Sequence, residues 1–240
     1  GTDYTPAYAT EGKPISAFYL YRTDGIFQSD AEAAAYVNAN GERLQPNAKA
    51  GDIRFKDING DGVLDENDRE YCGTGIPKVE ANLNLTAGYK GFDLSLLFGS
   101  AWGHKLFNGN RYFYESMQTP GQMLTSVLDA WTPTNTDTDM TRAVLNDPNR
   151  NARESDRFLE NGNFVRLRQA QLGYTLPTNI LKKAYIEKLR FYISGENLFT
   201  ITKYSGTDPE FSSSSPLDTG IDSYIFPFTR SFTVGAQLTF

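Results

Sequence analysis

The sequence is poor in the residues that form many enzyme and metal sites. It contains one cysteine, Cys72, and one histidine, His104, among 240 residues. A single cysteine excludes an internal disulfide framework and a cysteine-rich metal site. A Ser-His-Asp or Cys-His catalytic site would have to use His104, which we interpret instead as an ordinary hydrogen-bonding residue. Cys72 has no basic neighbour in sequence and is interpreted as a bystander thiol, so we expect no enzyme.

Positive charge is also scarce. The chain has 23 Lys and Arg against 29 Asp and Glu, which gives a formal net charge of -6 and a sequence pI near 4.9. A protein that binds nucleic acid needs a basic face to neutralise phosphates. The charge balance therefore excludes nucleic acid as an expected partner.

Long apolar runs are missing as well. A transmembrane helix needs roughly 18 or more consecutive apolar residues, and the sequence has no such run. The strands of a transmembrane barrel need only about 9–11 residues that alternate between apolar and polar. A mean hydropathy of -0.47 fits such strands as well as it fits a soluble β-protein. Since no signal peptide stands at Gly1, we expect an exported chain that is mature or truncated.

Alternation of apolar and polar residues is the strongest pattern that is present. In the segment 228–240, the residues Phe232, Val234, Ala236, Leu238 and Phe240 share one face, with polar residues or glycine between them. This period of two predicts a β-strand. Similar alternation predicts strands over four further segments: Leu83–Tyr89, Phe92–Trp102, Asn163–Leu176 and Leu189–Thr202.

The connections between these strands differ in length. Lys90-Gly91 suits a tight hairpin turn, whereas 102–163 and 203–226 are long and polar. A change of phase at Arg166 and Arg168 predicts either a β-bulge or a strand end that stands above a membrane. Short turns that alternate with long loops are typical of a transmembrane β-barrel. Residues 1–75 are predicted to be mostly loop, with an aromatic stretch at 15–21 and a helix over 31–38 that has Asp30 as its N-cap.

An acidic loop, within residues 51–70, has the spacing of a calcium-binding loop. Oxygen ligands fall at its first, third, fifth, seventh, ninth and twelfth positions, with glycine at the sixth. We expect a structural Ca²⁺ rather than a calcium switch, because flanking helices are not evident. The alternative is an Asx-rich turn that its own hydrogen bonds hold without metal. The predicted ligands are Asp57, Asn59, Asp61, the carbonyl of Val63, Asp65 and Asp68.

Aromatic residues in the long loop form a second candidate site. They could stack on sugar rings or peptide side chains, or pack between loops or against a partner. These residues are Tyr112, Phe113, Tyr114 and Trp131. The carboxylates of Asp208 and Glu210 could suggest glycosidase chemistry, but we predict a structural role in their loop.

Four motifs resemble segments of the SusC/RagA family of TonB-dependent outer-membrane transporters. They occur in the order and at the spacing of that family, from about Ile15 to the end of the chain. The motifs are GDIRFKDINGDGVLDENDRE at 51–70, FVRLRQAQLGYTLP at 164–177, ISGENLFTITKYSGTDPE at 193–210 and RSFTVGAQLTF at 230–240.

The resemblance implies a fold and a function. It implies an all-β chain in which residues 1–240 are the C-terminal part of an antiparallel transmembrane barrel of about 22 strands. The acidic loop would lie in an extracellular loop. The plug domain and the TonB box would belong to a missing N-terminal part, and terminal Phe240 would be the signal for barrel assembly.

The implied activity is import across the bacterial outer membrane. The substrates would be oligosaccharides, other glycans or peptides, taken up with a SusD-like surface lipoprotein and energised by TonB. The chain would also contact lipid and the remainder of its own barrel, since an open sheet leaves unpaired edges. The alternative is a secreted, calcium-stabilised β-sandwich that binds carbohydrate. A sandwich would bury the apolar face of 232–240, whereas an importer would expose it.

Overall fold

A computed structural model describes residues 5–118, 120–181, 185–211, 213 and 215–240 of the chain. The described residues form two compact units. The first unit is made from the segments 1–76, 105–160 and 212–225, and the second from 77–104, 161–211 and 226–240. No helix among the described residues is long and apolar enough to cross a membrane.

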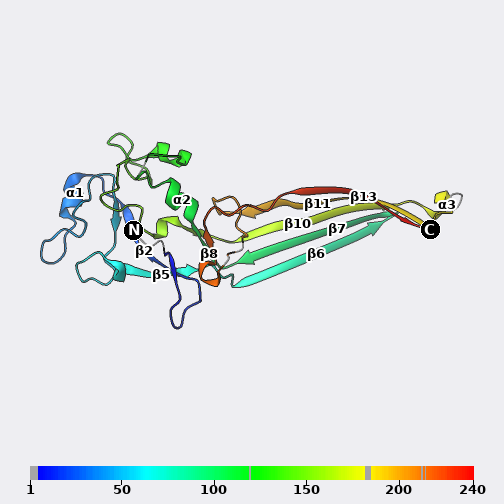
Figure 1. Cartoon of the computed structure of the whole chain (residues 1–240), viewed down its shortest axis with the longest axis horizontal. Helices are drawn as coiled ribbons and strands as arrows, with labels where there is room; N and C mark the ends of the chain where they lie inside the picture. The colour runs from blue at the N-terminus through cyan, green and yellow to red at the C-terminus, as the bar shows by residue number, and fades with distance from the viewer. Residues whose placement is uncertain (1–4, 119, 182–184, 212, 214) are drawn as a thin grey trace. The chain divides into compact units, whose positions relative to one another are not determined.

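The second unit is dominated by one antiparallel sheet of five long strands (Figure 1). The strand order is β13-β11-β10-β7-β6. The strands are β6 (Val79–Tyr89), β7 (Phe92–Trp102), β10 (Phe164–Thr175), β11 (Lys188–Thr202) and β13 (Ser231–Thr239). The five predicted strands are therefore confirmed, with ends that shift by a few residues. The short helix α3 (Thr178–Leu181) follows β10.

The register of this sheet gathers apolar and polar residues into separate cross-strand rows. One row is apolar on every strand: Val234, Ile193, Leu172, Leu94 and Ala87. The adjacent row is polar throughout: Thr233, Ser194, Gln171, Ser95 and Thr86. Because successive side chains of a strand point to opposite faces, these rows lie on opposite faces of the sheet. The sheet thus has one apolar and one polar face.

Local backbone geometry matches two of the sequence predictions. Lys90 and Gly91 join β6 to β7 with φ values of 46° and 87°, which is the left-handed conformation that a tight hairpin turn requires. The pairing of β10 with both neighbours shifts register between Leu167 and Gln169. The predicted bulge beside Arg168 is therefore confirmed.

The first unit contains short strands and helices around small cores. Its sheets have the orders β1-β2-β5, β12-β8-β9 and β3-β4, and the β12-β8 pair is parallel. The strands are β1 (Ala7–Tyr8), β2 (Ala17–Tyr21), β3 (Thr23–Ile26), β4 (Ile53–Phe55), β5 (Arg69–Thr74), β8 (Lys105–Asn108), β9 (Leu159–Asn161) and β12 (Ile221–Asp222). The helices are α1 (Asp30–Ala35) and α2 (Gly109–Tyr114), with 3-10 turns at Glu66–Asp68, Thr125–Asp129, Asp156–Phe158 and Pro216–Asp218.

Segments far apart in sequence form the main core of the first unit. Its buried members are Phe18, Leu20, Phe107, Phe158 and Ile221. A second cluster joins Tyr21 to Ile53 and Phe55, which are almost fully buried. Burial of large apolar side chains is the main source of fold stability. The first unit therefore has cores of its own.

Of two predictions for the N-terminal third, one is confirmed and the other is wrong in detail. Most of the described residues 5–75 lie outside helices and strands, as predicted, and within the aromatic stretch β2 pairs with β1 and β5 and buries Phe18 and Tyr21. Helix α1 has Ser29 as its N-cap, not Asp30, because the Ser29 side chain accepts a hydrogen bond from the backbone N–H of Glu32. Asp30 is instead the first helical residue. Local propensity marks the helix but leaves its first residue ambiguous.

The antiparallel, mainly β architecture agrees with the predicted fold class. The described residues do not form a closed sheet: β6 and β13 are its two edges, and each pairs with a single strand. Barrel closure and the size of the barrel therefore stay predictions.

Candidate functional site

The apolar face of the five-stranded sheet is exposed. Val234 is 82% exposed, Phe232 77% and Ile193 55%. Other large apolar side chains exposed on this face are Phe92, Leu94, Leu172, Phe191 and Leu238. Soluble monomers rarely expose contiguous apolar patches larger than a few hundred Å². A β-sandwich would bury these side chains in its core, so their exposure argues against the sandwich alternative.

The opposite face of the sheet carries charged pairs. The Arg190 guanidinium of β11 donates from Nε to Oδ1 of Asp93 on β7 at 2.9 Å. This pair reaches across β10 at Gly173, where a Cβ would lie 2.5 Å from that Asp93 oxygen. Glycine at this position therefore leaves room for a charged bridge between strands that are not neighbours.

Two carboxylates of the loop after β11 hold the arginines of the bulged strand. Arg166 forms a buried ion pair with Asp208, and Arg168 donates to Oε1 of Glu210 at 2.7 Å. Asp208 also accepts from the backbone N–H groups of Glu210 and Phe228. These contacts support the predicted structural role of Asp208 and Glu210, and they explain why Arg166 and Arg168 break the apolar pattern.

The acidic loop is a tight turn held by its own carboxylates. Asp57 accepts from the backbone N–H groups of Gly60 at 2.7 Å and Gly62 at 2.8 Å. Both glycines have positive φ, of 72° and 84°, which side-chain-bearing residues rarely adopt. Asp61 accepts from the N–H of Val63 at 2.9 Å. The backbone of this loop therefore folds around the carboxylate oxygens of Asp57 and Asp61.

Asp68 closes this loop from inside the protein. It is 0% exposed, and its two oxygens accept from the N–H groups of Ile58 and Asp65, each at 2.8 Å. Asp65 in turn caps the 3-10 turn by accepting from Asn67. Among the described residues, no group of three or more His, Cys, Asp or Glu is arranged to hold a metal ion. The calcium site stays a prediction.

The predicted aromatic residues fall into packed and exposed groups. Trp131 is 8% exposed, and its indole N–H donates to Gln28 at 3.0 Å. Tyr112 packs edge-on against Phe158 of the core, and burial raises its pKa to about 12. Their aromatic faces are thus engaged within the first unit.

Phe113 and Tyr114 lie together with a residue that sequence reasoning missed. The ring of Tyr224 stacks on Phe113 and meets Tyr114 edge-on, each at a centroid distance of 5.6 Å. Phe113 is 41% and Tyr224 54% exposed. Tyr224 follows a serine-rich segment more than 100 residues from Phe113 in the chain, and no local pattern indicated their contact.

Cys72 lies in the first unit and His104 in the second. Burial raises the pKa of the Cys72 thiol, although the nearby Arg22 guanidinium opposes this shift. A raised pKa reduces the thiolate fraction at neutral pH and weakens the nucleophile. His104 is 5% exposed, and its ring Nδ1 is buried with no hydrogen-bond partner among the described residues, so the expected side-chain hydrogen bond is not seen at that nitrogen.

Relatives of known class match nearly the whole chain. TonB-dependent receptor P3 of Formosa agariphila is 30% identical over 236 residues, which cover 96% of this chain and 22% of that protein. TonB-dependent receptor SusC of Bacteroides thetaiotaomicron is 28% identical over 199 residues, which cover 81% and 18%. The chain is related to the SusC/RagA-type TonB-dependent receptors. No family model matches it.

Solved structures of the SusC/RagA type share the fold. The RagAB peptide importer in its open-open state superposes with a TM-score of 0.70 at 23% identity, over 95% of this chain and 23% of that chain. The closed-closed state gives the same TM-score at 22% identity. The mainly β, antiparallel fold is therefore RagAB-like. This chain spans about a quarter of these structures and less than a quarter of its first curated relatives.

Proposed function

We propose that this SusC/RagA-like chain forms part of the wall of an outer-membrane importer. The observation that carries the proposal is the one-sided sheet: its apolar face is exposed, and its other face carries polar side chains and the Arg190–Asp93 pair. In a transmembrane barrel the apolar face meets lipid and the polar face meets the lumen. The unpaired edges of β6 and β13 would join the remainder of the barrel, because a membrane does not tolerate exposed sheet edges.

The proposed activity is TonB-dependent uptake of oligosaccharides, other glycans or peptides, without bond-making or bond-breaking. The curated relatives are named as receptors, and the solved neighbours as a peptide importer. A SusD-like surface lipoprotein would be the outer partner, and TonB would act through the part of the receptor outside this chain. The exposed ring pair of Phe113 and Tyr224 is a surface on which a sugar ring, a peptide side chain or that partner could stack.

Site-directed spin labels in the full receptor test the lipid-facing assignment. Cysteines would be introduced at Val234 and at its neighbour Thr233 in a Cys72→Ser background, in outer-membrane vesicles. We expect a label at Val234 to collide mainly with oxygen, which partitions into lipid. A label at Thr233 should collide mainly with a water-soluble nickel chelate. Equal access of both reagents to both positions would contradict the proposal.

We further propose that the acidic loop binds a structural Ca²⁺. Its side-chain donors and the carbonyl of Val63 are all hard oxygens, as calcium requires. Each carboxylate oxygen that accepts one N–H keeps a second lone pair for a cation. The ligands would be Asp57, Asn59, Asp61, Val63, Asp65 and Asp68, and the ion would cross-link the loop without taking part in transport.

Calcium titration of the full receptor tests this site. Asp57→Asn should weaken calcium binding about tenfold, because it removes one charged ligand. Asp218→Asn removes an exposed carboxylate elsewhere in the first unit and should leave binding unchanged. Calcium should also slow proteolytic cleavage within 57–68, and a chelator should reverse this protection. If the receptor bound no calcium at this loop, the proposal would be wrong and the hydrogen bonds alone would hold the loop.

Terminal Phe240 is proposed as the signal for barrel assembly. It is 83% exposed, so its replacement by alanine removes no core contact. Phe240→Ala should therefore lower the amount of receptor that reaches the outer membrane without changing the uptake per assembled molecule. If the Phe240→Ala receptor reached the outer membrane in wild-type amounts, Phe240 would not be the assembly signal.

A further inference from the structure

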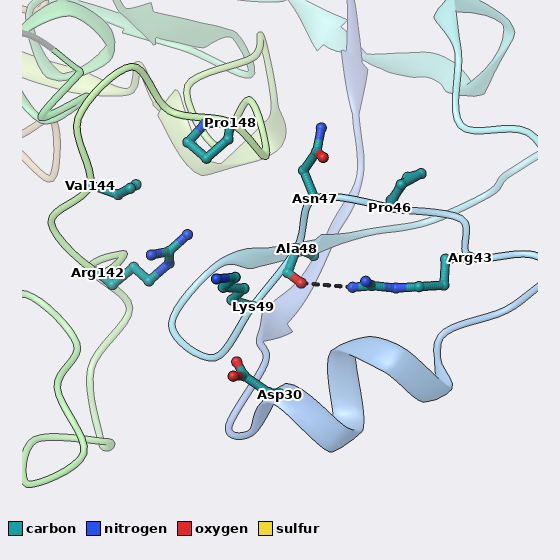
Figure 2. Close-up of a pocket in the computed structure, with 9 residues that line it drawn as sticks. All are labelled: Asp30, Arg43, Pro46, Asn47, Ala48, Lys49, Arg142, Val144 and Pro148. Atoms are coloured by element: carbon teal, nitrogen blue, oxygen red, sulfur yellow. Dashed lines mark hydrogen bonds between the residues drawn. The ribbon is translucent and has the colours of Figure 1, made fainter.

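The first unit contains a polar cavity that the proposed function does not use. Its volume is about 520 Å³, within the range of small-ligand sites, which is about 300–1,000 Å³. It lies between the turn after Arg43 and the segment 142–148 (Figure 2). Its charged lining residues are Asp30, Arg43, Lys49 and Arg142, and its apolar walls include Pro46, Val144 and Pro148.

The turn that presents Lys49 is fixed by three hydrogen bonds. A terminal nitrogen of Arg43 donates to the Ala48 carbonyl at 2.7 Å, as Figure 2 shows. The Ala50 N–H donates to Asp30 at 2.9 Å, and the Lys49 N–H donates to Asp52 at 2.8 Å. Since these bonds hold the backbone on both sides of Lys49, a ligand would meet a preorganised turn.

The opposite wall is anchored by a buried ion pair. Arg142 donates from Nε and Nη2 to the two oxygens of Asp52, at 2.7 and 3.1 Å. Asp52 is 0% exposed and also accepts from Asn151 at 3.0 Å. This network neutralises Arg142 and fixes its side chain at the cavity wall. Its Nη1 has no hydrogen-bond partner among the described residues.

The other two cations of the cavity are not neutralised. Among the described residues, neither Lys49 nor Arg43 forms an ion pair. The Nε of Arg43 is a buried donor with no acceptor in the described part of the chain. Asp30 supplies the one carboxylate of the lining, and one of its oxygens is engaged by Ala50. In a chain of net charge -6, the cavity is a locally cationic site.

We infer that this cavity binds a carboxylate group of a ligand, with Lys49 as the main charge partner. Arg43 and Arg142 would add hydrogen-bond donors, and Asp30 would accept from hydroxyl or amino groups of the same ligand. An acidic sugar and the C-terminus of a peptide both carry such a carboxylate beside donor groups. The inference rests on the proposed import function only for the source of the ligand, because binding itself needs no transport.

Equilibrium binding to the purified full receptor tests the inference with two matched pairs of ligands. Trigalacturonate is compared with neutral maltotriose, and trialanine with trialanine amide. We expect at least one acidic ligand to bind about tenfold more tightly than its neutral match. Lys49→Gln should remove that advantage, and higher salt should weaken it. The pair that shows the effect identifies the source as a glycan or a peptide.

Lys56→Gln is the control, because it removes an exposed cation of the same unit outside this cavity. It should leave the preference for the acidic ligand unchanged. Equal binding of acidic and neutral ligands in both pairs would overturn the inference, as would equal effects of Lys49→Gln and Lys56→Gln. Uptake measured on the same variants is a separate readout: a receptor that binds the acidic ligand but imports nothing contradicts the import function and keeps the cavity assignment.

Discussion

At the residue scale, the environment of single side chains sets their chemistry. Tyr112 has a pKa raised to about 12, first because burial disfavours the phenolate and then because Glu154 adds a negative charge nearby. Glu154 is 3% exposed and pairs with Arg69 at 3.1 Å. The neutral phenol of Tyr112 is therefore part of the folded first unit, and its ionisation opposes folding.

The raised pKa of Tyr112 predicts how stability depends on pH. A group whose pKa is higher in the folded state stabilises the fold below its unfolded pKa of about 10. That stability is lost as the pH rises towards about 12. We expect Tyr112→Phe to remove one late step from the phenolate absorbance titration. Loss of an early step in Tyr112→Phe would contradict the assignment.

At the element scale, the stability of strand β10 depends on how deeply its two arginines are buried. The bulged strand β10 places Arg166 at 2% exposure against Asp208, whereas the side chain of Arg168 is 41% exposed beside Glu210. Loss of one partner from a buried pair leaves an uncompensated charge, whereas an exposed pair contributes little. Loss of Arg166 should therefore destabilise β10 more than loss of Arg168.

A matched pair of substitutions tests this difference. Arg166→Gln should reduce the local stability of β10 by about 3–5 kcal/mol, since it leaves Asp208 buried without its cation. Arg168→Gln should change it by less than about 1 kcal/mol. Hydrogen exchange of the β10 amides in the full receptor reports this local stability. Equal exchange rates in both variants would show that burial of the Arg166–Asp208 pair does not affect the stability of β10.

The hairpin between β6 and β7 gives a second test at this scale. Gly91 has a φ of 87°, and a Cβ there would lie 2.8 Å from the Thr175 carbonyl oxygen. Gly91→Ala should therefore destabilise the hairpin by about 1–2 kcal/mol. Lys90→Asn should cause no loss, because asparagine accepts the left-handed conformation better than lysine. Exchange rates of the β6 and β7 amides check both variants, and an unchanged Gly91→Ala rate would contradict the turn assignment.

At the scale of the whole molecule, the two faces of the sheet should respond in opposite ways to charge. Ile193→Arg on the apolar face should cost about 2–4 kcal/mol near the middle of a bilayer. Ser194→Arg on the polar face should be tolerated, because that face would meet water. Denaturant titration of the receptor folded into lipid vesicles measures both. A greater loss for Ser194→Arg would reverse the assignment of the faces.

The strands could be predicted from sequence because their signal is local. Phe92–Trp102 has the bounds of β7, and the phase change at Arg166 and Arg168 marks the bulge. The short strands β2 and β5 gave a weaker signal, and their pairing depends on contacts between residues about 50 positions apart. The sequence therefore indicated the aromatic stretch at 15–21 but not the strands with which it pairs.

The sequence by itself determined which faces of the strands are apolar, because alternation with a period of two is a property of neighbouring residues. It also determined the oxygen spacing of the acidic loop and the relation to the SusC/RagA type. Only the tertiary structure decided which distant groups meet: Arg166 with Asp208, Phe113 with Tyr224, and Lys49 with Arg142 around one cavity. Such contacts depend on strand register and chain crossing, which no local pattern encodes.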